Sequence, residues 1–167
     1  DRLRQQRRDP GHHISVRKSQ FSDLLFGIRY DKVDDLETLE SQFTAMRSDA
    51  ARHGECHRAK FNRNACLGFV PVAGAHPDAA QFWSRAASLP SCDIEVTDNL
   101  IVDPTQGVFL GNHRRLYKAG TRLADGRVLA VAETLDDGGF DRVIIARNRI
   151  IGGYSHERWS DAVQAGA

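Results

Sequence analysis

The sequence predicts an α+β domain in which N-terminal helices pack on a mainly antiparallel sheet. Two observations carry this prediction. Between residues 34 and 54, apolar residues recur every three or four positions, which is the spacing of one helix face. Beyond Pro90, apolar residues instead alternate with polar ones, and turn-forming Asp, Asn and Gly separate the runs. Helices followed by strands are typical of α+β domains.

The first predicted helix covers residues 34–54. Its apolar stripe consists of Leu36, Leu39, Phe43, Met46 and Ala50. Acidic residues at its start suit the positive end of a helix dipole, and Gly54 suits a left-handed stop.

Two shorter helices follow, at residues 56–66 and 77–88, with a buried strand at 69–72 between them. Pro77 suits the first turn of the second of these helices. A last short helix begins at His156 or Ser160 and ends at Ala165. The predicted strands carry Ile94 and Val96; Leu100 and Val102; Val108 and Leu110; Val128, Ala130 and Ala132; Val143 and Ile145; Ile150 and Ile151. No internal repeat is evident.

Length and composition indicate one domain. The chain has 167 residues and a net charge of +1, so no global charge steers it to nucleic acid, and it has no apolar run of membrane-spanning length. Residues 1–12 are rich in arginine and predict a flexible basic leader, followed by a single α+β domain at 13–167. The chain starts with Asp rather than Met, which favours a processed product or a domain of a longer protein.

The chain has three cysteines, an odd number, which favours free thiols over a set of disulfides. We therefore expect a protein of a reducing compartment, either cytoplasmic or delivered into a cell as an effector, rather than a disulfide-bonded secreted domain. Cys56 is the best candidate for a nucleophile. It follows the helix stop at Gly54 and begins the next predicted helix, where unpaired N–H groups lower a thiol pKa. The alternative is a small buried residue, because free cysteines are among the most buried side chains.

The stretch from residue 54 to 107 resembles the transglutaminase-like branch of the papain-like cysteine enzymes. The resemblance lies in Gly-Glu-Cys before a helix, in Leu-Gly-Phe before a strand, in Ile-Glu-Val, and in Leu-Ile-Val-Asp-Pro-Thr. It implies a papain-like core with Cys56 as nucleophile and Asp103 as the acid that orients a histidine. The family's histidine position reads Ser91-Cys92-Asp93 here, so His76 or His113 would have to serve as the base.

This resemblance implies a thiol hydrolase or acyltransferase of the peptidase, amidase or transglutaminase type, acting on a peptide or protein. A domain that keeps the fold without the activity, as a non-catalytic interaction module of a larger protein, is the alternative. For that module, Asn112 to Arg115 and Lys118 form a basic edge suited to a peptide or an anion. Nothing in the sequence indicates a cofactor, and the oligomeric state stays open.

Two further constellations compete with the thiol site. One is a set of possible zinc ligands: His53, Cys56, His57, Cys66 and His76. Their spacing lacks the closely paired ligands of a structural zinc site, which favours buried thiols over a metal site. The closing hairpin is faintly similar to the barnase-like ribonucleases, which implies an endoribonuclease using Glu133, Arg142 and His156. Nucleic acid is therefore not excluded as a partner.

Overall fold

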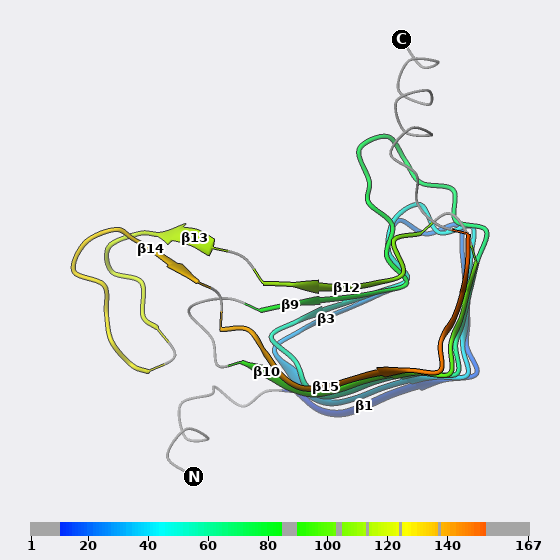
Figure 1. Cartoon of the computed structure of the whole chain (residues 1–167), viewed down its shortest axis with the longest axis horizontal. Coiled ribbons are helices and arrows are strands. Elements are labelled where there is room, and N and C mark those ends of the chain that lie inside the picture. Colours follow the sequence, from blue (N-terminus) through cyan, green and yellow to red (C-terminus); the bar gives the residue numbers. More distant parts are fainter. Residues whose placement is uncertain are drawn as a thin grey trace.

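The chain winds into a parallel β-solenoid, a stack of coils whose strands form three faces (Figure 1). The computed structural model describes residues 11–84, 90–102, 105–112, 114–123, 125–136 and 138–152. Over these residues it contains strands and turns and no helix. The predicted α+β fold with a papain-like core and a mainly antiparallel sheet is therefore wrong.

Face 1 is a five-stranded parallel sheet at the bottom of Figure 1. Its strands, in stacking order, are β1 (Gly11–Arg17), β4 (Val33–Leu39), β7 (His57–Asn62), β10 (Ser91–Thr97) and β15 (Phe140–Ala146). Face 2 follows each of these strands after a sharp corner. Its strands are β2 (Gln20–Ser22), β5 (Gln42–Thr44), β8 (Ala65–Leu67), β11 (Leu100–Val102) and β16 (Arg149–Ile151).

Face 3 is a four-stranded parallel sheet that closes the first four coils; among the described residues the fifth coil consists of its face-1 and face-2 strands. Its strands are β3 (Ile28–Asp31), β6 (Ala51–Gly54), β9 (Ala80–Trp83) and β12 (Val108–Gly111). The strands β13 (Arg114–Tyr117) and β14 (Glu133–Asp136) form an antiparallel hairpin, which projects away from the stack at the left of Figure 1.

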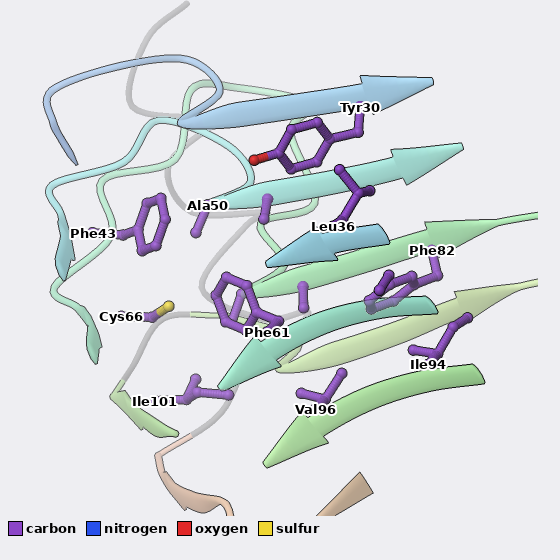
Figure 2. Close-up of a cluster of buried hydrophobic side chains, with 14 of the residues drawn as sticks. Tyr30, Leu36, Phe43, Ala50, Phe61, Cys66, Phe82, Ile94, Val96 and Ile101 are labelled. Atoms are coloured by element: carbon purple, nitrogen blue, oxygen red, sulfur yellow. The ribbon is translucent and has the colours of Figure 1, made fainter. Parts of the chain in front are cut away.

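The core is built from rows of like side chains stacked along the solenoid axis (Figure 2). On face 2, the rings of Phe21 and Phe43 stack with centroids 4.8 Å apart. On face 3, His53 and Phe82 stack at 4.3 Å, and burial lowers the pKa of this histidine to about 4. Because each apolar side chain meets its neighbour from the next coil, the solenoid buries a continuous core that no single coil could form.

The corner between faces 1 and 2 carries a ladder of polar side chains. At successive coils the corner residue is Ser19, Ser41, Asn64, Asn99 and Asn148. The backbone N–H of each coil donates to the side-chain oxygen of the next coil; from Asn64 to Asn99 the distance is 2.8 Å. The Asn99 side chain also donates to the carbonyl of Phe61 at 2.8 Å. The ladder therefore satisfies backbone groups that the corners leave unpaired.

The predicted helix at residues 34–54 forms β4, β5 and β6 instead. Side chains in these strands alternate between inside and outside, but the alternation slips by a residue near the bends, where neighbouring residues are both buried (38–39 and 48–51) or both half-buried (44–45). A period of two with an inserted residue at each bend averages to the spacing of a helix face. The residues of the expected stripe are buried, as predicted, on three faces rather than one.

The other helices predicted within the described residues are also strands in the structure. Residues 56–66 form β7 and β8, and the described part of 77–88 forms β9. Several predicted strands are confirmed, those at Ile94, Leu100, Val108, Val143 and Ile150, although they pair in parallel. Residues 128–132 form no strand apart from an isolated bridge at Val128. The predicted leader and the C-terminal helix lie almost wholly outside the described residues. Within the described ranges, no helix is long and apolar enough to cross a membrane.

Candidate functional site

Cys56 lies in the core at a corner between strands, not at the start of a helix. Its side chain is 1% exposed, and its thiol donates to the carbonyl oxygen of Gly54 at 3.3 Å. A thiol in this position is shielded from any substrate in solution. Cys66 is likewise fully buried, and burial raises the pKa of its thiol.

Of the partners predicted for Cys56, His76 alone lies within the described residues. His76 is exposed in the loop between β8 and β9, outside the core. Asp103 and His113 lie outside the described residues. The thiol-enzyme hypothesis therefore stays a prediction from the sequence, and the geometry of Cys56 gives it no support.

The structure instead brings a different cysteine and histidine into contact. His57 Nδ1 lies 2.8 Å from the sulfur of the partly exposed Cys92, one coil further along face 1. Burial and the neighbouring carboxylate of Asp93 raise the pKa of the Cys92 thiol. A thiol that holds its proton is a poor nucleophile, so this contact is best described as a thiol that donates to an imidazole.

The zinc and ribonuclease residues are also dispersed. In the part of the chain that the structure describes, no three His, Cys, Asp or Glu side chains are grouped to hold a metal ion. Glu133 lies on the β13–β14 hairpin beside Arg127, whereas Arg142 lies on face 1 and binds Asp93 at 2.6 Å. His156 lies outside the described residues.

A hollow of about 730 Å³ lies on face 1 and is lined mainly by charged side chains. These charges already bind one another: Arg58 donates to Asp35 at 3.0 Å, and Lys60 lies 3.5 Å from Glu37. No Phe, Tyr or Trp lines it. Charged side chains that already pair with one another have little left to bind a ligand with. We therefore describe this surface as an ion-pair lattice.

Face 3 carries two adjoining hollows that share the side chains of Arg52 and Trp83, and we call them together the face-3 hollow. The larger, of about 590 Å³, lies between the loop at residues 70–79 and the outer side of face 3, and its walls include Phe26, Phe109 and His76. The smaller, of about 210 Å³, is lined by Arg29, Tyr30, Asp31, Arg52, Gly54, Trp83 and Arg115.

Trp83 is the partly exposed aromatic residue that joins the two hollows. It pairs in register with Gly111, where an added Cβ would come within 2.6 Å of the indole. Gly111 therefore leaves the space in which the indole lies against the sheet. Phe109 lies beside the indole at 5.3 Å between centroids, and the Arg115 guanidinium lies 5.6 Å from it. The result is an aromatic surface flanked by cations.

A buried polar network supports the floor of the larger hollow. Arg52 Nε lies 2.9 Å from Asp49 and donates to Gln81 at 2.6 Å, and Gln81 in turn donates to Asp78 at 2.7 Å. The other oxygen of Asp78 is buried with no hydrogen-bond partner among the described residues. Burial, with the nearby charge of Asp49, raises the pKa of Asp78 to about 7. The network holds Arg52 in place between the two hollows.

Two of these residues were already candidates from the sequence: Arg115 within the predicted basic edge, and His76 as a base for the predicted thiol site. Trp83 falls within a predicted helix, and Arg52 within the last turn of another. The signal that identifies the site is the alignment of the coils, which puts Gly54, Trp83 and Gly111 in one row across face 3. No protein-family model, curated protein or solved structure matches this chain.

Proposed function

We propose that the chain is a carbohydrate-binding β-solenoid whose face-3 hollow holds an oligosaccharide. The observation that carries the proposal is the partly exposed indole of Trp83, lying beside Gly111 at the junction of two hollows. The flat face of an indole packs against the C–H groups of a sugar ring, while polar side chains around it meet the hydroxyl groups.

The other lining residues fit such a ligand. Phe26 and Phe109 widen the apolar surface, while the exposed side chains of His76 and Gln106 and the half-buried Arg52 place polar groups beside it. A long basic groove of the kind that follows a nucleic acid backbone is missing from this lining, because Asp31 and Asp49 lie among its arginines. A peptide substrate for a thiol enzyme remains a prediction from the sequence alone.

The test is calorimetric titration of the chain with a panel of soluble hexasaccharides, neutral and acidic. We expect at least one to bind, and Trp83→Ala to weaken that binding by about tenfold or more, the loss expected for a stacked aromatic anchor. Leu116→Ala is the matched control, because Leu116 is 71% exposed on the hairpin and lines neither hollow.

Trp83→Phe guards against misfolding, since it keeps an aromatic ring on the sheet and is expected to retain part of the affinity. Thermal unfolding should show that each variant is folded. Binding that survives Trp83→Ala in a folded protein would contradict the proposal, as would a folded wild-type chain that binds none of the panel.

A further inference from the structure

Charged side chains on face 1 and its corner follow a rule: neighbours along the stacking direction carry opposite charges. One row runs Asp35, Arg58, Asp93, Arg142. A second runs Lys18, Glu40, Arg63, Asp98, Arg147, with ion pairs of 3.9, 3.0 and 2.7 Å. Opposite charges on neighbouring strands stabilise a sheet, and like charges destabilise it. The alternation therefore favours the observed register.

Face 3 breaks this rule at the smaller hollow. Arg29 on β3 lies directly opposite Arg52 on β6 in the parallel register. Two guanidinium groups on neighbouring strands repel each other. Arg115 adds a third cation to the same hollow, and Asp31 is the one carboxylate in its lining. Departures from such a pattern of alternating charge are expected at binding sites.

The surroundings of these arginines prepare the hollow for a small anion. Asp49 and Gln81 hold Arg52 through its Nε, and the Phe26 ring lies 4.8 Å from its guanidinium carbon. A volume of about 210 Å³ has room for a carboxylate or sulfate group. Guanidinium groups bind carboxylate and sulfate oxygens through charge-assisted hydrogen bonds. Such a group would also relieve the repulsion between Arg29 and Arg52.

We propose that the smaller hollow binds the carboxylate or sulfate group of an acidic sugar whose ring packs on Trp83. This inference rests on the proposed carbohydrate binding and narrows it to acidic oligosaccharides. The larger hollow then receives the sugars that continue the chain on the other side of Trp83.

The test compares pairs of ligands that differ only in charge. Hexamers of galacturonate, of mannuronate and of the glucuronate-containing hyaluronan repeat are titrated as free acids and as methyl esters, together with one sulfated neutral hexasaccharide and its unsulfated parent. We expect the charged member of a binding pair to bind at least about tenfold more tightly, the value of one charged hydrogen bond. That preference should weaken as NaCl is raised.

Arg29→Gln is the informative variant, because Arg29 is exposed and its loss leaves the core intact. It should remove most of the preference for the charged ligand, because it weakens binding of the charged member more than binding of the neutral one. Arg149→Gln, on the exposed side of face 2, is the matched control and should change neither. Preference for a sulfated over a carboxylated ligand would identify sulfate as the bound group.

Equal binding of charged and neutral partners, or an unchanged preference in Arg29→Gln, would overturn the acidic specificity while leaving carbohydrate binding in place. If no member of any pair binds the folded wild-type chain, both proposals fail.

Discussion

Replacing Asp78 with Asn should stabilise the protein at neutral pH. Asp78 is fully buried, and its pKa rises from 3.8 to about 7 through burial and the charge of Asp49. Because the folded state holds this proton more tightly than the unfolded state does, Asp78 makes the free energy of unfolding fall as pH rises from about 4 to about 7, against the rise that His53 contributes through its lowered pKa of about 4. The whole shift corresponds to a loss on the order of 4 kcal/mol. An amide at this position has no proton to lose.

The assay is urea unfolding of wild type and Asp78→Asn at pH values from 4 to 8. We expect similar stability at pH 4 and a growing advantage of Asp78→Asn above it, reaching a few kcal/mol at pH 8. Asn keeps an oxygen to accept from Gln81, so the network is preserved. Asp98→Asn is the control: the Arg147 guanidinium lowers the pKa of Asp98, so this variant should show the same pH dependence as the wild type between pH 4 and 8.

A less stable Asp78→Asn protein at pH 8 would refute this reasoning, because it would mean that the ionised carboxylate is needed in the fold. A wild-type protein whose stability rises between pH 4 and 7 while Asp78→Asn shows the same rise would refute it equally.

Three further predictions test the solenoid itself. Asn99→Ala should lower the free energy of unfolding by about 2 to 4 kcal/mol, since it leaves two buried backbone groups unpaired, whereas Gln42→Ala on the exposed side of face 2 should have little effect in the same denaturant titration. Glu40→Arg places three cations in succession in one corner row and should cost about 1 kcal/mol, a loss that shrinks in 1 M NaCl. Iodoacetamide should label Cys92 first in the native protein, and mass mapping that finds Cys56 labelled first would contradict the buried placement of that thiol.

The strands of the second half could be predicted from the sequence because alternation of apolar and polar residues is a local signal. Ile94 and Val96, for example, both point into the core, as their spacing predicts. The direction of pairing is not local: a parallel partner lies a whole coil away, and nothing between Ile94 and Val96 indicates it. The prediction for the first half of the chain was wrong for a different reason. An extra residue at each bend makes the apolar residues of successive strands recur at the spacing of a helix face.

The repeat is not evident in the sequence because the coils differ in length. Corner residues of successive coils lie 22, 23, 35 and 49 residues apart along the chain. The longer intervals contain the loop at residues 68–79 and the β13–β14 hairpin, which interrupt a coil of about 22 residues. Once these insertions are set aside, a charged residue followed by Ser or Asn opens every face-2 strand.

The candidate site depends on that repeat and could not be predicted without it. Arg29 and Arg52 are 23 residues apart and become neighbours through the register of face 3. Trp83 and Gly111 meet in the same way. By contrast, Cys56 was chosen for a helix start, and the described residues on either side of it form the strands β6 and β7 instead.

The most direct test of the account is an NMR titration of the ¹⁵N-labelled protein with the tightest-binding hexasaccharide of the panel. We predict that the indole N–H of Trp83 and the backbone amides of Arg52 and Gly111 shift as ligand is added, while the amide of Asp93 on face 1 does not. Shifts confined to face 1, with the Trp83 resonance unmoved at saturation, would contradict the assignment of the binding surface to face 3.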